Sequence, residues 1–195
     1  MPAGELNLVC HLYGACLLVH DFIARFLDAP RFLGYCKQCP SFGCYWNCPP
    51  LPTERLRALR AFQHVHLMAV QAVVPGALGE QHFDTAEALR KASYVIMDQL
   101  RRTYDPRVLA LERKTPGSLA CLPGRCMGCP AGSCTRRPGA PCRHPELMRP
   151  SLEAYGFDVA KASDELLHLP LEWPEKGRLP AHLAVVYGLF LGQKN

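Results

Sequence analysis

The stretch that decides the fold is HVHLMAVQAVV, residues 64–74, a nearly continuous apolar run rich in β-branched side chains. Pro75 and Gly76 end the run, and a short apolar segment bounded by such turn residues predicts a buried β-strand. Immediately before it, TERLRALRAF (residues 53–62) places its large apolar side chains at helical spacing. The centre of the chain therefore predicts a helix that leads into a core strand.

Further along the chain the same two patterns recur. Asp84 opens a capping-box sequence, and the helix that follows is expected to run to about Tyr104 and to end at Pro106. The segment HLAVVYGLFLG (residues 182–192) predicts a second buried strand. This order of elements predicts an α+β (or α/β) fold: one compact domain over all 195 residues, with a small mixed sheet, flanking helices and two cysteine-rich metal loops.

The boundaries of these parts follow from local composition. Residues 1–33 are expected to form a helical lead-in that Pro30 stops, because apolar residues recur there at helical spacing, namely Phe22, Ile23, Phe26 and Leu27. Residues 34–52 form the first cysteine loop. Residues 117–150 form the second, which starts with a short strand at 117–121 and then contains six Pro and four Gly between residues 122 and 150. A stretch without periodicity needs something other than a local apolar core to order it, and a metal supplies that.

Nine of the eleven cysteines fall in these two loops. Each loop contains a C-x2-C step, which lets two thiolates converge on one metal ion or one edge of a cluster. Two such steps, each with further cysteines close by, predict a metal protein. The candidate metal ligands are Cys36, Cys39, Cys44 and Cys48 in the first loop, and Cys121, Cys126, Cys129, Cys134 and Cys142 in the second.

A disulfide framework is the rival interpretation of so many cysteines. Their number is odd, the chain is longer than typical disulfide-stapled domains, and the first residues lack a basic region and a cleavage site of a secretory signal. No apolar run is long enough to span a bilayer. We therefore expect a cytoplasmic protein with no membrane contact, in a reducing compartment where clustered cysteines mean metal or redox chemistry.

Two metals compete for these loops. Structural zinc takes four ligands in a tetrahedron, often from paired C-x2-C or C-x2-H steps. Iron–sulfur loops place several cysteines in a short run, often with Pro directly after a cysteine, as occurs here after Cys39, Cys48 and Cys129. The spacing favours one or two iron–sulfur clusters, expected as 4Fe-4S, with zinc as the alternative. The sequence leaves open whether Cys121 is spare or is contributed to the first site across the fold.

The net charge of +5 arises largely from arginines around the second loop. Nucleic-acid binding is one reading, but no aromatic residues alternate with the arginines to stack bases. The favoured reading is that the arginines offset the negative charge of thiolate-bound metal, and nucleic acid is not an expected partner.

Polar residues near the second loop supply further candidates. Arg143, Arg149 and Asp158 are the candidate cofactor-contacting residues. Glu153 is the one candidate acid–base group, if it is partly buried beside the second metal site. The alternative is structural: Ser151 caps a short helical turn and Asp158 caps the next segment.

The chain resembles the DUF2284 family of predicted metal-binding proteins of bacteria and archaea. The resemblance runs from about Cys36 to the C-terminus and is carried by several motifs together: Cys36-x2-Cys39 followed by Tyr45-Trp46-Asn47-Cys48-Pro49-Pro50, then Gly124-Arg125-Cys126-x2-Cys129, Pro141-Cys142-Arg143-His144-Pro145, and RPSLEAYGFDV at residues 149–159. It implies metal binding, with iron–sulfur as the expected form, in an intracellular protein. It implies no particular reaction.

Three functions are consistent with these observations. The first is an iron–sulfur protein in electron transfer or redox assistance to a partner protein. The second is a zinc-stabilised interaction module without catalysis. The third is an enzyme whose incompletely ligated cluster activates a small-molecule substrate beside Glu153.

Overall fold

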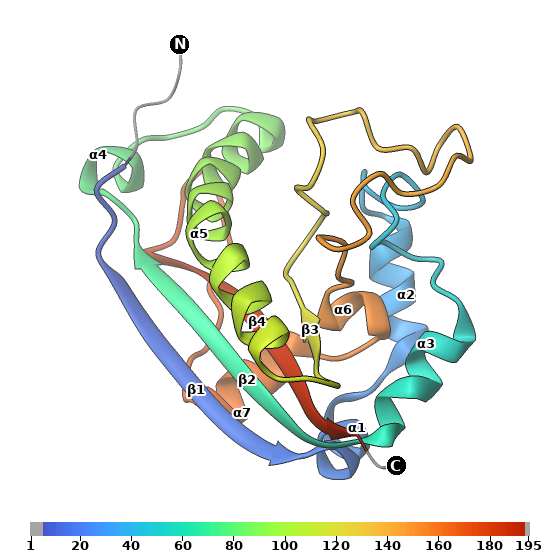
Figure 1. Ribbon diagram of the computed structural model, residues 1–195. Coiled ribbons are helices and arrows are strands. Elements are labelled where there is room, and N and C mark those ends of the chain that lie inside the picture. Colours follow the sequence, from blue (N-terminus) through green and yellow to red (C-terminus); the bar gives the residue numbers. More distant parts are fainter. Residues whose placement is uncertain (1–5, 194–195) are drawn as a thin grey trace.

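The computed structural model describes residues 6–193 and centres on one four-stranded sheet (Figure 1). The strand order is β1-β2-β4-β3, and each pair of neighbours is antiparallel. The sheet is therefore purely antiparallel, whereas the sequence predicted a mixed sheet. The α+β class is confirmed. The strands are β1 (Cys10–Leu18), β2 (Phe62–Val73), β3 (Leu119–Cys121) and β4 (His182–Gln193).

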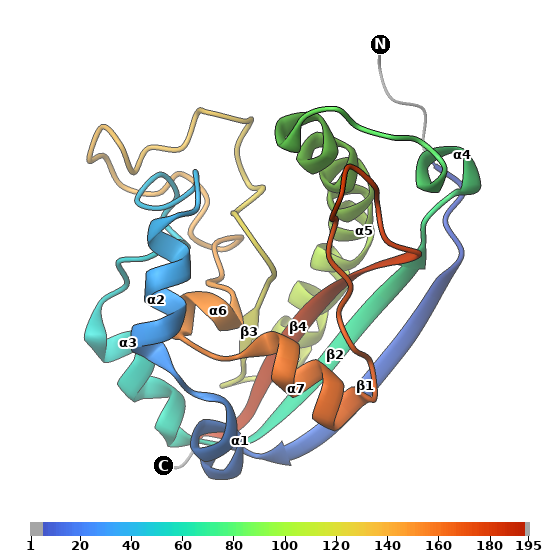
Figure 2. The same cartoon turned by 180° about the vertical axis from the view of Figure 1, so that it is seen from behind.

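Helices cover both faces of this sheet, as a comparison of Figures 1 and 2 shows. On one face α5 (Ala86–Lys114) packs over β4 and β3, and on the other face lie α1, α6 and α7. Because side chains alternate along a strand, β2 sends Val65, Leu67 and Ala69 into one core and Val70 and Ala72 into the other. The remaining helices are α1 (Val19–Phe26), α2 (Ala29–Lys37), α3 (Thr53–Ala58), the 3-10 turn η1 (Leu59–Ala61), α4 (Gly76–Gly79), α6 (Leu152–Tyr155) and α7 (Val159–Leu167).

The expected helical lead-in is wrong over residues 10–18, which form the edge strand β1. This segment is apolar on both faces, so its polarity does not alternate, and the sequence pattern alone does not distinguish helix from strand. Pairing with β2 decides the matter, from Cys10 opposite Ala72 to Leu18 opposite His64. The predicted helix around Phe22 and Phe26 is confirmed as α1.

Two proline assignments also differ from expectation. Pro30 does not end a helix but lies in the first turn of α2, where Asp28 caps the helix by accepting from the Arg31 N–H. Cys36 is therefore helical, and the first cysteine loop begins after Lys37 rather than at residue 34. Pro106 likewise lies inside α5, which continues to Lys114. The buried residues beyond Pro106 hold that helix against the sheet and override the lost backbone hydrogen bond.

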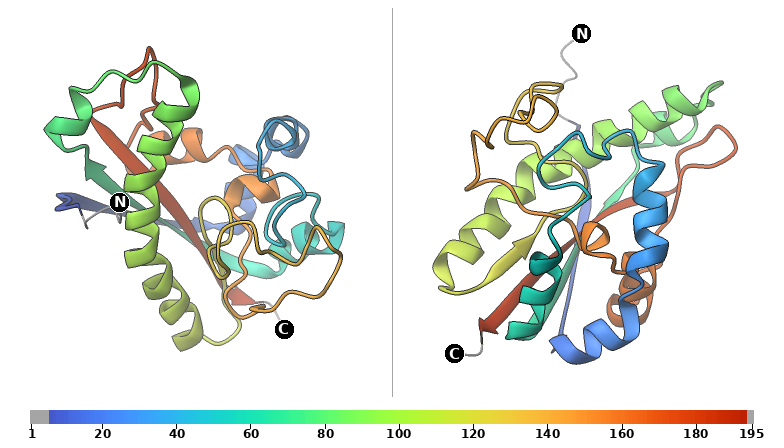
Figure 3. Two further views of the ribbon diagram at one scale, coloured as in Figure 1. Left: turned by 90° about the horizontal axis from the view of Figure 1, so that it is seen from above. Right: turned by 90° about the vertical axis from the view of Figure 1, so that its right-hand side faces the viewer.

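Both cysteine loops lie at the same side of the molecule, beyond α2 and α6 (Figures 1 and 3). Residues 122–150 form no helix or strand, as predicted, and they run beside residues 38–52 in each view. The short strand that delivers Cys121 is confirmed as β3. Over residues 6–193, no helix combines the length and apolar character that crossing a membrane requires.

Candidate metal centre

The first group of thiols consists of Cys36, Cys39, Cys44 and Cys48. Cys36 lies in the last turn of α2, and the loop then folds through three tight turns, in which the amides of Cys39, Cys44 and Cys48 donate to carbonyls three residues earlier, each at 3.0 Å. These turns bring the four side chains within electrostatic reach of one another, because the charges of the other three each raise the pKa of Cys48. The structure thus assembles the first predicted set.

The metal-free thiols of this group hold their protons firmly. Burial, assisted by neighbouring negative charge, raises the pKa of Cys48 to about 12 and that of Cys36 to about 11. A thiol must lose its proton to bind a metal. A metal that binds the first group would therefore have to displace these protons.

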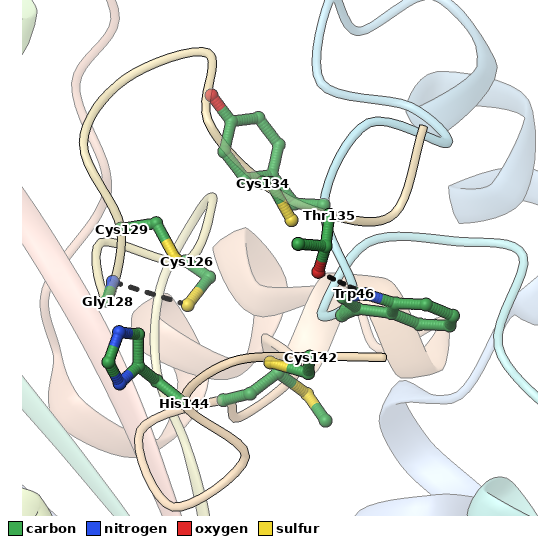
Figure 4. Close-up of a pocket in the computed structure, with 10 residues that line it drawn as sticks. Trp46, Cys126, Gly128, Cys129, Cys134, Thr135, Cys142 and His144 are labelled. Atoms are coloured by element: carbon green, nitrogen blue, oxygen red, sulfur yellow. Dashed lines mark hydrogen bonds between the residues drawn. The ribbon is translucent and has the colours of Figure 1, made fainter. Parts of the chain in front are cut away.

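The second group consists of Cys126, Cys129, Cys134 and Cys142, which line one pocket together with Trp46, Thr135 and His144 (Figure 4). Burial raises the pKa of Cys126, and the charges of the other three cysteines raise it further. Trp46 belongs to the first cysteine loop. It reaches across to this pocket, where its Nε1 donates to Thr135 Oγ1 at 3.3 Å.

Hydrogen-bond donors approach the sulfur atoms in both groups. The Ser41 and Gly128 amides donate to Cys39 Sγ and Cys126 Sγ, each at 3.4 Å. Arg137 donates to Cys44 Sγ through Nε at 3.2 Å and through Nη2 at 2.9 Å. Such donors stabilise negative charge on sulfur, and they tune metal–thiolate centres. The chemistry of both donor sets therefore fits thiolate-bound metal.

Among residues 6–193, no three His, Cys, Asp or Glu side chains are placed to hold one metal ion between them. The four cysteines of the second group nevertheless share one pocket. The second group therefore surrounds a common space, and Cys44 of the first group lines the neighbouring groove with Cys134.

Cys121 does not join either group. It lies in β3 with 1% of its surface exposed, inside the apolar core. Burial raises its pKa, and the negative charges of Glu153 and Glu112 add to this effect. Its predicted ligand role stays a prediction. Cys10 and Cys16, which were not expected to be ligands, lie on β1, and all eleven cysteines are free.

The charge of Glu153 acts on Cys36 of the first group and on Cys121 of the second loop, and its expected place beside the second metal site stays a prediction. Glu153 is the second residue of α6, a turn that packs against α2, and its negative charge raises the pKa of both Cys36 and Cys121. Burial raises the pKa of Glu153 itself, although hydrogen bonding to its own backbone and to Ser151 opposes the shift. A carboxyl group with this environment can hold a proton near the first centre.

The three candidate cofactor-contacting residues have different surroundings. Arg149 forms a two-pronged ion pair with Glu112 at 2.7 and 2.8 Å, which fixes the end of the second loop to α5. Asp158 accepts from the Lys161 amide and caps α7, as the structural alternative predicted, and it also pairs with Arg31 at 3.3 Å. Ser151 caps α6 in the same way.

Arg143 borders a groove between the two loops. The groove is also lined by Cys44 of the first group and Cys134 of the second, and Arg143 Nη2 donates to the Ser133 carbonyl at 2.9 Å. Arg143 therefore lines a space that both predicted metal loops share.

Sequence reasoning missed the residue that joins the loops. Asn47 was quoted as part of a motif but was assigned no role, yet it is 1% exposed and its side chain bonds to both cysteine loops. An Asn between a Trp and a cysteine in a Pro-rich loop gives a weak signal, since nothing in the local pattern shows that the side chain is buried.

An α+β scaffold that carries two groups of four thiols on adjacent loops defines a cysteine-rich metal-binding class of protein. Residues 26–191 match the family model described as "Predicted metal-binding protein (DUF2284)", and the chain belongs to this family. No curated protein and no solved structure matches the chain.

Proposed function

We propose that this protein carries two iron–sulfur clusters, one at each group of four cysteines, and that it serves electron transfer or a redox-accessory role for a partner protein. The observation that carries the proposal is the gathering of two sets of four thiols on adjacent loops, with hydrogen-bond donors directed at sulfur atoms in both sets. Each set supplies the four thiolates that a 4Fe-4S cluster takes.

We favour a cluster over a zinc ion at these two groups. Tetrahedral zinc with Zn–S bonds of about 2.3 Å draws its thiolates to within about 3.8 Å of one another. A cluster binds each thiolate through a different iron atom, which leaves the sulfur atoms farther apart. In support, the four thiols of the second group line one pocket, and Cys39, Cys48 and Cys129 are each followed by Pro, as in iron–sulfur loops.

An iron–sulfur cluster supplies one-electron redox chemistry when bound. The residues of this chain would set how that chemistry is used. Trp46 and Thr135 close one side of the second pocket, and Arg137 offsets negative charge at Cys44. Cys39 is exposed, so the first centre would lie within reach of a redox partner at the protein surface.

The cytoplasmic location that we propose rests on the same cysteines. All eleven are free, and free thiols in this number are compatible with a reducing compartment.

Anaerobic purification followed by iron, zinc and acid-labile sulfide analysis tests the proposal. We expect iron and sulfide in matched amounts, at about four of each per occupied cysteine group. Cys39→Ser and Cys129→Ser should each remove one centre, whereas Cys10→Ser on β1 should leave the metal content unchanged. Zinc without sulfide would contradict the proposal and would favour the zinc-stabilised interaction module.

The enzymatic alternative gains one observation from the structure, because Glu153 lies within electrostatic reach of Cys36 and its pKa is raised by burial. A small-molecule substrate that binds an incompletely ligated first centre would change the visible spectrum of the protein. Iron at fewer than four per first-loop cysteine group, together with such a change, would favour this function over electron transfer.

A further inference from the structure

Asn47 occupies a buried position between the two cysteine loops. It belongs to the first loop, where it directly precedes Cys48, but three of its hydrogen bonds go to the segments that flank and begin the second group. Its Nδ2 donates to the Gly124 carbonyl at 2.9 Å and to the Arg149 carbonyl at 3.2 Å. These two carbonyls lie near the start and at the end of the second loop, so one amide holds both together.

The carbonyl oxygen of the same side chain touches a cysteine of each group. Asn47 Oδ1 accepts from the Cys126 amide at 2.9 Å and lies 3.7 Å from Cys48 Sγ. Because Asn47 is 1% exposed, water cannot replace these partners without a movement of the loops. The position of the Cys126 backbone is therefore tied to the position of Cys48.

A second set of contacts crosses in the opposite direction. Arg136 of the second loop donates to three carbonyls of the first loop, those of Tyr45, Cys48 and Pro50. Its guanidinium also lies over the Trp46 ring, 5.7 Å from the ring centroid. The residues on both sides of Asn47 are thus held by the second loop, which leaves the two loops little freedom to order separately.

We propose that Asn47 is a positioning residue that makes the assembly of the two metal centres cooperative. The inference rests on the proposed function in that each cysteine group binds a metal centre. Metal binding at the first group fixes Cys48 and with it Asn47, whose amide then holds Gly124, Cys126 and Arg149 in place. The second centre therefore forms at a smaller cost in conformational entropy. By thermodynamic linkage, metal binding at the second group must raise the affinity of the first group by the same factor.

The size of the effect should fall in the range of ordinary coupling between two sites. Such couplings change affinity about 5- to 150-fold. Four contacts from one buried side chain, two of them to cysteine residues of different groups, are enough to place this pair of sites within that range.

The test is a double-mutant cycle on the full chain, purified anaerobically: wild type, Cys129→Ser, Asn47→Ala, and both together. The readout is the rate at which the first centre loses its metal to an excess of chelator. We expect Cys129→Ser to speed this loss at least 5-fold in the wild-type background and to have little effect in the Asn47→Ala background.

Ser163→Ala serves as the matched control, because it removes a buried side-chain hydrogen bond, to the Leu169 carbonyl at 2.7 Å, in α7 and outside both cysteine loops. The coupling should survive in that variant. A second readout needs no metal: in the metal-free protein, Asn47→Ala should speed hydrogen exchange at the Cys126 amide, whose acceptor it removes.

Two results would overturn the inference. One is a first centre that releases metal at the same rate with and without Cys129→Ser. The other is an equal effect of Cys129→Ser in both Asn47 backgrounds. The cycle is also run with zinc as the probe, so that a chain that holds zinc but no iron and sulfide refutes the proposed clusters while still deciding the coupling. A chain that binds neither metal refutes both.

Discussion

Replacing Glu112 should detach the second cysteine loop from the body of the fold. Glu112 is 9% exposed, and its carboxylate holds Arg149 through Nε and Nη2 at 2.8 and 2.7 Å. It also accepts from the buried Ala120 amide at 2.8 Å. Glu112→Ala therefore leaves both a guanidinium that is only 20% exposed and a backbone donor in β3 without partners.

The expected cost follows from these two losses. Breaking a buried ion pair costs about 3–5 kcal/mol, and an unsatisfied buried donor adds about 1–3 kcal/mol. Because Arg149 keeps some access to water, we expect about 3–5 kcal/mol in total for Glu112→Ala. Glu112→Gln keeps an oxygen for the Ala120 amide and should cost about 2 kcal/mol, the value of a hydrogen bond to a charged group.

Urea unfolding of the metal-free, reduced protein measures these changes. Glu87→Gln is the control, because it removes the exposed ion pair to Lys91 on the same helix and should leave the urea midpoint unchanged. The double variant Glu112→Gln with Arg149→Gln should lose less free energy of unfolding than the two single variants lose in sum.

The result also decides the role of Arg149. If Glu112→Gln changes the urea midpoint as little as Glu87→Gln does, Glu112 does not anchor the second loop. If Arg149→Gln lowers the metal content without changing the stability of the metal-free protein, Arg149 contacts the cofactor, as the sequence predicted, rather than anchoring the loop.

Three further predictions follow from other parts of the structure. Gly156→Ala should destabilise the protein by about 2–5 kcal/mol in urea unfolding, because the glycine has φ +98° and a Cβ there would lie 2.5 Å from Ala29 Cα. Gly34→Ala in α2, where no atom lies within 4 Å of the new Cβ, should instead stabilise it by up to about 1 kcal/mol, and equal effects of the two would contradict this reasoning. The metal-free protein should become less stable as the pH rises from 9 towards 11, because unfolded thiols ionise near pH 9 while the pKa of Cys36 is about 11 and that of Cys48 about 12. Replacing both Cys36 and Cys48 by Ser should make the urea midpoint less dependent on pH. An unchanged dependence would contradict this prediction. Removal of metal by a chelator should expose residues 122–150 to proteolysis ahead of the sheet, and uniform cleavage would show that the loop is ordered without metal.

The grouping of the cysteines could be predicted because it is a local property. Four cysteines within 13 or 17 residues, separated by Gly and Pro, cannot lie far apart once the chain turns, and the structure assembles both sets. The apolar runs that became β2 and β4 were equally local signals. Most apolar residues of β2 meet a covering helix layer on one side of the sheet or the other, which makes its sequence almost continuously hydrophobic.

The features that the sequence did not predict all depend on partners distant in sequence. Residues 10–18 are a strand because β2 offers them a pairing edge. The long helix passes Pro106 because buried residues beyond it gain more by packing than the one lost hydrogen bond costs. The charge of Glu153 acts on Cys36 because α6 packs against α2, a contact between segments more than 100 residues apart.

The sequence by itself therefore determined the grouping of the cysteines into two sets and the prediction of metal binding, since short cysteine spacings constrain local geometry whatever the rest of the chain does. Only the tertiary structure decided how those sets relate to each other and to the core. It buried Cys121 in β3 inside the apolar core, and it placed Asn47 between the loops with a contact to each. These features arise from packing and hydrogen bonding between distant segments, and that information is absent from any local pattern of residues.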